Sequence, residues 1–141
     1  MHHAHFPTSA TPRELPGRSL WMLVEPALGN ASRLSMCVIR VQPGETVHPA
    51  HSHPGAEELI YILQGEGEAF ALSSARGRQF HPLNQGTAIV FLEDDVHMIR
   101  NQGTEPMEVA CFFSPACTPE TYRVFDTVRW GDEKLPADPR S

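Results

Sequence analysis

The sequence has 141 residues, of which 40% are apolar and 20% charged, enough for one globular domain with a hydrophobic core and too few for two full domains. Its formal net charge of −6 and its scattered arginines offer no basic surface for a phosphate backbone, so we expect no nucleic-acid partner. No apolar run approaches the ~20 residues of a membrane helix, and the N-terminus lacks the features of a secretory signal. The three cysteines lie in or beside apolar runs, which favours buried, reduced thiols. We therefore expect a cytoplasmic protein with no membrane partner.

The chain divides into three segments. Residues 1–17 contain three prolines and no apolar periodicity, which indicates an extended N-terminal arm to which we assign no function. Residues 18–115 are expected to form the folded domain, and residues 116–141 a C-terminal tail. Within the tail, Thr118, Pro119 and Glu120 provide an N-cap, a proline at the first helical position and an early acid, which predicts a short helix that stops by Gly131.

The central segment breaks into short β-rich runs separated by turn signals. The runs cover residues 20–24, 33–41, 59–63, 68–72, 88–92, 96–100 and 107–113. Glycine, proline and asparagine clusters lie between them, and no long segment has helical periodicity. This pattern predicts an all-β fold, an antiparallel sandwich or barrel.

A pair of histidines followed by an acid is the strongest functional signal. His51 and His53 are separated by one residue, and Glu58 follows five residues later. Residues two apart in a strand project from the same face with ~6.6 Å between their Cα atoms, so both imidazoles can converge on one ion. Pro54 and Gly55 then turn the chain, so that Glu58 opens the next strand. The three side chains would form the two-histidine, one-carboxylate set of open first-row metal sites.

A fourth ligand has to come from a later segment. His97 begins the run VHMIRN, whose alternation puts His97, Ile99 and Asn101 on one face. A lone histidine on an apolar face is more often a hydrogen-bonded core residue than a ligand, so a structural role is the alternative. His48 and His81 lack matching partners, which favours surface or supporting roles for both.

Two motifs in this order resemble those of the cupin superfamily, and the resemblance covers roughly residues 33–114. The first motif is matched by Gly44, His51, His53, Glu58 and Gly65, with one extra residue between Gly44 and His51. The second is matched in spacing by Gly86, His97 and Asn101, whereas Leu92 and Asp94 replace its proline and inner glycine. Aspartate tolerates a left-handed backbone better than most residues, so we expect the turn before His97 to form.

The resemblance implies a jelly-roll β-barrel that holds one divalent transition metal, which could be Fe, Mn, Zn or Ni. The implied ligands are His51, His53, Glu58 and His97. Counting six residues forward to Gly65 selects Glu58 over Glu57, which would then face the outside.

Fold and metal together do not determine the activity. Three imidazoles and one carboxylate leave up to two open positions on an octahedral metal, and cupins include dioxygenases, decarboxylases, isomerases, lyases and binding proteins. Our first hypothesis is an enzyme that acts on a small oxygen-bearing molecule by oxygenation or metal-polarised proton transfer. The alternative is a non-catalytic module that binds a small ligand such as a sugar or an organic acid.

The residues around the metal indicate a small pocket. Ile60, Ile62 and Ile99 share faces with the expected ligands, which predicts a largely apolar interior. Arg40, charged within the run MCVIRV, is the best candidate for gripping an anionic substrate, and solvation at the strand end is the alternative. The aromatic residues Tyr61, Phe112 and Phe113 are expected in packing or in a subunit interface.

The run SLWMLV at residues 19–24 is apolar on both strand faces, so its exposure on a monomer would leave a large apolar patch. We therefore expect a two-fold homodimer in which the N-terminal segment packs against the partner's sheet. The alternative is that this strand closes the chain's own barrel.

Overall fold

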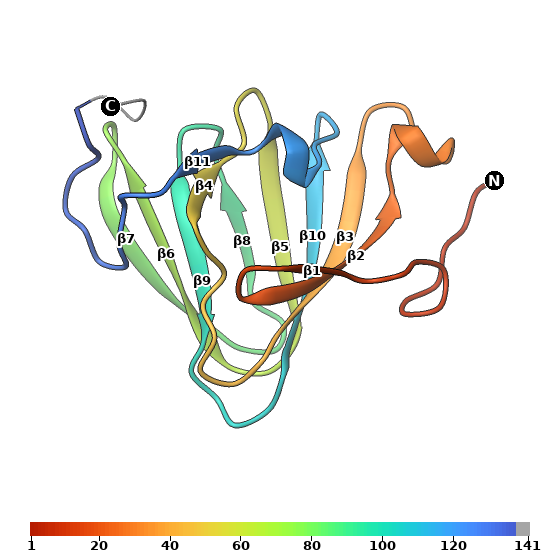
Figure 1. The fold of residues 1–141 in the computed structure, drawn as a ribbon, viewed down its shortest axis with the longest axis horizontal. Coiled ribbons are helices and arrows are strands. Elements are labelled where there is room, and N and C mark those ends of the chain that lie inside the picture. The colour runs from red at the N-terminus through yellow and green to blue at the C-terminus, as the bar shows by residue number, and fades with distance from the viewer. Residues whose placement is uncertain (138–141) are drawn as a thin grey trace.

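The computed structural model describes residues 1–137, which fold into two facing antiparallel β-sheets (Figure 1). The strands are β1 (Arg13–Leu15), β2 (Arg18–Val24), β3 (Ser35–Val41), β4 (Ala50–Ser52), β5 (Glu57–Gln64), β6 (Gly67–Ser73), β7 (Gly77–Leu83), β8 (Ala88–Phe91), β9 (Val96–Asn101), β10 (Met107–Ser114) and β11 (Arg123–Phe125). Two short 3-10 turns complete the described elements, η1 (Pro26–Leu28) and η2 (Pro119–Thr121). The expected all-β, antiparallel fold is confirmed.

Strand order brings distant segments together. One sheet has the order β1-β2-β3-β10-β5-β8, and the other has the order β11-β4-β9-β6-β7. The strands that carry the two motifs therefore lie in different sheets: β4 and β9 are neighbours in the five-stranded sheet, whereas β5 lies in the six-stranded sheet. A side chain from β5 can meet side chains from β4 and β9 only across the interior.

Alternation along β5 shows how the sequence builds this interior. Glu58, Ile60 and Ile62 are buried, whereas Leu59 and Tyr61 between them are exposed. Because side chains of a strand point to opposite faces in turn, one face of β5 supplies the core and the other faces outward. The largest cluster of buried apolar side chains lies between the two sheets and continues from β5 onto β3, β9 and β10.

Three strands were not expected from the sequence. β1 and β11 have three residues each, too few to display an alternating pattern, whereas the equally short β4 is the strand expected to carry the histidine pair. β7 has seven residues, but its polar sequence GRQFHPL is mostly exposed and contains Pro82. A proline lacks the N–H for a ladder hydrogen bond and is tolerated here because β7 lies at the edge of its sheet.

The N-terminal segment belongs to the fold instead of extending away from it. Residues 13–15 form β1, which pairs with β2, and Phe6 packs edge-on against Trp21 with ring centroids 5.1 Å apart. The guanidinium of Arg40 lies 4.9 Å from the Trp21 ring centroid on the same outer face. The segment thus covers the outer apolar side chains of β2 in its own chain, where we had expected it to cover a partner.

The expected C-terminal helix is a single 3-10 turn. Thr118 caps this turn through a reciprocal hydrogen-bond box with Thr121, but the chain becomes extended again at Tyr122 and forms β11. β11 pairs with β4, so the segment after β10 crosses from one sheet to the other (Figure 1). None of the described residues forms a helix of the length and apolarity needed to cross a bilayer.

A close backbone contact at Gly17 fixes the β1–β2 hairpin to the loop before β4. Gly17 has a φ of 77°, and a Cβ atom there would lie 1.8 Å from the Thr46 carbonyl oxygen. Gly29 has nearly the same φ, 73°, but no atom lies within 4 Å of the corresponding Cβ position. Alanine substitutions at these two glycines can therefore separate two contributions to the free energy of unfolding: the left-handed backbone, which both share, and the steric clash, which only Gly17 has.

We expect Gly29→Ala to lower the free energy of unfolding by about 1–2 kcal/mol, the cost of a left-handed alanine. Gly17→Ala should cost about 1–3 kcal/mol more, because the added methyl group also overpacks the contact with Thr46. Urea unfolding followed by tryptophan fluorescence measures both values. Equal losses would show that the hairpin is not held against Thr46.

Candidate metal centre

Three histidines converge in the interior from two adjacent segments. His51 on β4 is the direct cross-strand partner of His97 on β9, and His53 follows β4 by one residue. All three are buried, and one ring nitrogen from each lies within 4.8 Å of the others. This arrangement could hold a metal ion, because imidazole nitrogens are common ligands for first-row transition metals.

Hydrogen bonds to the outer nitrogens fix how these rings point. Nδ1 of His51 lies 3.0 Å from the Pro49 carbonyl oxygen, and Nδ1 of His97 lies 2.9 Å from the Asp95 carbonyl oxygen. Nδ1 of His53 lies 3.3 Å from Sγ of Cys117. A carbonyl oxygen only accepts, so His51 and His97 donate through Nδ1, and the Nε2 atom of each is directed inward.

Glu58 reaches the same point from the opposite sheet. Its Oε1 atom lies 3.0 Å from Nε2 of His53 and 2.9 Å from Nε2 of His97. Burial alone would raise the pKa of Glu58, but the charges and hydrogen bonds of His53 and His97 outweigh it and hold this pKa well below its usual value. Burial lowers the pKa of His51 well below its usual value, and His97 and His53 add to the effect. The site therefore combines an ionised carboxylate with a neutral His51.

Aromatic rings support each histidine. Tyr122 stacks on His51 with centroids 4.8 Å apart, and Phe91 stacks on His97 with centroids 4.0 Å apart. Phe113 packs edge-on against His53 at 5.0 Å. These contacts restrict rotation of the three imidazoles and exclude water from their faces. Phe113 thus has a packing role, as expected, whereas Tyr61 and Phe112 lie exposed on the outer face.

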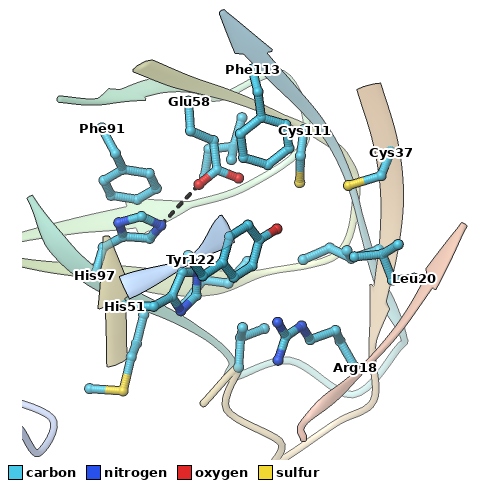
Figure 2. Close-up of a pocket in the computed structure, with 15 residues that line it drawn as sticks. Arg18, Leu20, Cys37, His51, Glu58, Phe91, His97, Cys111, Phe113 and Tyr122 are labelled. Atoms are coloured by element: carbon cyan, nitrogen blue, oxygen red, sulfur yellow. Dashed lines mark hydrogen bonds and ion pairs between the residues drawn. The ribbon is translucent and has the colours of Figure 1, made fainter. Parts of the chain in front are cut away.

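His51, His97 and Glu58 line one wall of a cavity between the sheets (Figure 2). The centres of water-sized molecules can occupy about 30 Å³ of this cavity, which is room for about two to three waters. Most of the remaining wall is apolar, with Leu20, Ile60 and Phe113 among its members. The expectation of a small, largely apolar pocket agrees with this geometry.

Arg18, and not Arg40, is the arginine that lines the cavity. Arg40 alternates outward with Met36 and Val38 on β3, and it pairs with Glu108 at 3.3 Å. Arg40 is therefore not the anion-gripping candidate of this pocket, because strand parity places it on the outer face, in line with the alternative of an outward position. Arg18 has the parity of Leu20 on β2, so extending the strand two residues towards the N-terminus would have identified it.

Tyr122 and Cys117 are also near the histidines, and no sequence signal marked either of them. Both lie in the crossing segment after β10, which the sequence offered only as a tail. Burial raises the pKa of Tyr122 well above its usual value and raises the pKa of Cys117 to about 11. The phenol and this thiol are therefore protonated at neutral pH.

The remaining predicted acids and histidines lie at the surface. Glu57 is exposed one residue before the buried Glu58, as the count to Gly65 implied. His48 and His81 are exposed as well, which matches the surface role expected for them.

The turn that delivers His97 forms without the proline and glycine of the second motif. The Asp95 N–H donates to the Leu92 carbonyl oxygen at 3.0 Å, and Oδ2 of Asp95 accepts from the Leu92 N–H at 2.8 Å. In residues 1–137 only glycines have a positive φ, so Asp94 does not use the left-handed conformation that we expected of it. The Asp95 side chain closes the turn instead.

Comparison with known proteins identifies the family. The family model for the cupin domain matches residues 37–113, which is more than half of the chain. The chain belongs to the cupin family. This cupin is 31% identical over 109 residues to germin-like protein subfamily 2 member 2 of Arabidopsis thaliana, covering 77% of this chain and 49% of that protein. It is 36% identical over 70 residues to germin-like protein 1 of Brassica napus, covering 50% of this chain and 34% of that protein. The cupin spans about half the length, or less, of these curated relatives.

Solved structures agree on the fold. The cupin superimposes on a formate complex of oxalate decarboxylase from Lactobacillus farciminis with a TM-score of 0.73 and 23% identity, over 82% of this chain and 33% of that one. Oxalate decarboxylase of Bacillus subtilis, in a study of its Mn(II) centres, gives a TM-score of 0.71 at 18% identity, over 80% of this chain and 29% of that one. These likenesses confirm the jelly-roll fold.

The closing role of Asp95 can be tested against its neighbour Asp94. Both carboxylates contact Arg76, but the Asp95 side chain is 6% exposed and the Asp94 side chain 50%. We expect Asp95→Asn to lower the free energy of unfolding by about 1–2 kcal/mol, because it weakens the buried hydrogen bond from the Leu92 N–H. Asp94→Asn should change it by less than about 0.5 kcal/mol, as for other exposed pairs. Thermal and urea unfolding measure both, and similar losses would contradict the assignment.

Proposed function

We propose that this cupin holds one divalent transition metal through His51, His53, Glu58 and His97 and acts on a small oxygen-bearing molecule. The hydrogen bonding of His97 carries the proposal. Its Nδ1 faces a carbonyl oxygen and its Nε2 faces the Glu58 carboxylate, and both of these partners only accept. Two acceptors on one imidazole require either a protonated ring or a cation between Nε2 and the carboxylate. A metal ion held between them by His51, His53 and Glu58 as well meets this need.

The donor set also fits such an ion chemically. Three imidazoles and a carboxylate suit iron, manganese, nickel or zinc, and they leave coordination positions for a further ligand. Nδ1 hydrogen bonds to backbone carbonyls, like those of His51 and His97, are the usual support of metal-binding histidines. A bound metal would supply Lewis acidity and an attachment point for an oxygen-donor ligand.

The other residues would act on the ligand and on water. Phe91, Phe113 and Tyr122 hold the imidazole planes and keep the cavity narrow. The Tyr122 hydroxyl provides a proton donor or acceptor within the cavity wall, and Arg18 provides positive charge. A small cavity with a few polar groups on apolar walls is typical of sites for small ligands.

The relatives favour this proposal over an inert barrel. The Bacillus subtilis oxalate decarboxylase, which has Mn(II) centres, shares the fold, so manganese joins iron as a metal to test first. A non-catalytic binding module is the alternative, and turnover distinguishes it from an enzyme.

The three cysteines are free in the structure, which supports the proposal of a reducing, cytoplasmic location.

Metal content of purified variants tests the ligand assignment. We expect His97→Ala to remove most of the bound metal and Glu58→Gln to weaken affinity by at least ~10-fold, since a neutral amide is a poorer ligand. The matched controls His81→Ala and Glu57→Gln change exposed residues and should retain the wild-type content. Elemental analysis gives stoichiometry and metal identity. Full occupancy in His97→Ala, or a larger loss in Glu57→Gln than in Glu58→Gln, would overturn the assignment.

The same proteins decide between catalysis and binding. The metal-depleted protein is reconstituted anaerobically with Fe(II) or Mn(II) and exposed to air with a panel of diketones, hydroxy acids and phenols. Oxygen uptake or product formation that disappears in His97→Ala supports the enzyme. Ligand-induced thermal stabilisation without any product supports the binding module.

We also propose that this cupin forms a homodimer through the outer face of its six-stranded sheet. Five large apolar side chains there are 39–51% exposed on three adjacent strands: Leu59, Tyr61, Leu63, Val90 and Phe112. Phe112, Leu59 and Val90 are direct cross-strand neighbours, so they form one continuous row. A second copy is the proposed occupant, because a two-fold axis places this uncharged row against itself. The N-terminal segment, which we had expected at the interface, already covers Trp21 of its own chain.

Leu59→Arg should convert the dimer into a monomer, because it places a charge in the middle of the row. Leu28→Arg is the matched control, since Leu28 is also exposed but lies in η1. Light scattering at micromolar concentration measures the mass of each protein. A monomeric wild type, or dissociation by both variants, would contradict the proposed interface.

A further inference from the structure

Arg18 places a positive charge at the cavity wall opposite Glu58. It is the first residue of β2 and shares the inner face with Leu20, and its guanidinium points into the cavity (Figure 2). Its Nη1 donates to the Pro16 carbonyl oxygen at 3.0 Å and to the His48 carbonyl oxygen at 3.1 Å. These two bonds hold the side chain in place and leave the donors at Nε and Nη2 without a hydrogen bond to any described residue.

This guanidinium has no counter-ion within residues 1–137. The ion pairs of that part of the chain include Arg13, Arg40, Arg76, Arg78 and Arg100, but not Arg18. Burial is the largest influence on its pKa and lowers it from the usual value. A partly buried charge that lacks an opposite charge is unfavourable until an anion pairs with it.

Tyr122 offers a second unused polar group on the same cavity. Its ring is held against His51, and its hydroxyl makes no hydrogen bond with the described residues. The hydroxyl points into the middle of the cavity in Figure 2, between the Glu58 end and the Arg18 end. A ligand that spans the cavity would meet the phenol on its way from the histidines to the guanidinium.

We propose that the cavity binds a small carboxylic acid as its anion, with the carboxylate paired to Arg18 and within reach of the Tyr122 hydroxyl. The two free nitrogens of the guanidinium suit the two oxygens of a planar carboxylate. Space for about two to three waters restricts the ligand to a small acid of a few heavy atoms. The inference rests on the proposed function, because it names the substrate class of the same site.

Glycolate and its neutral isostere glycolamide are the probes. Both have an oxygen donor for a metal and the same number of heavy atoms, so they differ mainly in charge at the Arg18 end. Isothermal titration of the metal-loaded wild type should show at least ~10-fold tighter binding of glycolate. Inorganic phosphate should bind more weakly than glycolate.

Variants assign this preference to Arg18. Arg18→Gln should lower the ratio of glycolate to glycolamide affinity by about 10- to 100-fold, and Arg18→Lys should restore part of it because it keeps the charge. Arg40→Gln is the matched control: it removes an outward arginine and should leave the ratio unchanged. If Arg18 only supports the fold, the ratio stays constant while the melting temperature falls in both Arg18 variants, which would overturn the proposal. Equal binding of the two probes by the wild type would overturn it as well.

Metal content, measured on every sample, separates this inference from the proposed function. Metal present with a ratio insensitive to Arg18 refutes the anion site and leaves the metal site standing. Metal absent with a ratio that still depends on Arg18 refutes the metal assignment and supports the anion site. Repeating the titration on metal-depleted protein measures the effect of Arg18 on the glycolate-to-glycolamide affinity ratio without the metal. We expect the wild type still to prefer glycolate and Arg18→Gln to lose that preference.

Discussion

The contact of Glu58 with His53 and His97 is the interaction on which the arrangement of this protein depends. Glu58 comes from the six-stranded sheet, and the two histidines are positioned by β4 and β9 of the other sheet, so a buried polar contact joins the layers across the core. Apolar packing tolerates small shifts of one sheet over the other, but charge-assisted hydrogen bonds of 2.9 and 3.0 Å do not. Burial of these groups is acceptable only while every one of them has a partner.

Several local features serve this contact. The β4–β9 register sets His51 opposite His97, and backbone carbonyls two residues before each of them hold their Nδ1 atoms. Asp95 closes the turn that leads into β9 through its own side chain, which makes the proline and glycine of the family motif dispensable here. The aromatic residues behind the imidazoles then convert oriented rings into a rigid set. A preorganised site of this kind loses little entropy when a ligand or metal enters.

Sequence reasoning reached the parts of the molecule that are encoded locally. Period-two alternation along the strand predicts Glu58 inside and Glu57 outside, and motif spacing predicts that His51, His53 and His97 converge, as they do. The short strands β1 and β11 and the polar edge strand β7 carry no such pattern, so the sequence does not reveal them. Tyr122 could not be found at all, because its place beside His51 results from a chain crossing between sheets and from no local signal. Arg18 shares the alternation of this strand, but the apolar run begins at Leu20, two residues after the true start of β2.

The positions of Arg18 and Tyr122 in the chain affect how this cupin is compared with relatives and engineered. The residues that match the family model run from 37 to 113, so Arg18 precedes that region and Tyr122 follows it. Chain segments outside the shared core thus supply two polar groups of the cavity wall, Arg18 and Tyr122, whereas the core supplies His51, His97 and Glu58. These two sets of lining residues can therefore change independently in evolution. On the proposed role of Arg18, exchanging only the flanking segments between relatives would alter ligand preference and leave the three histidines and Glu58 in place.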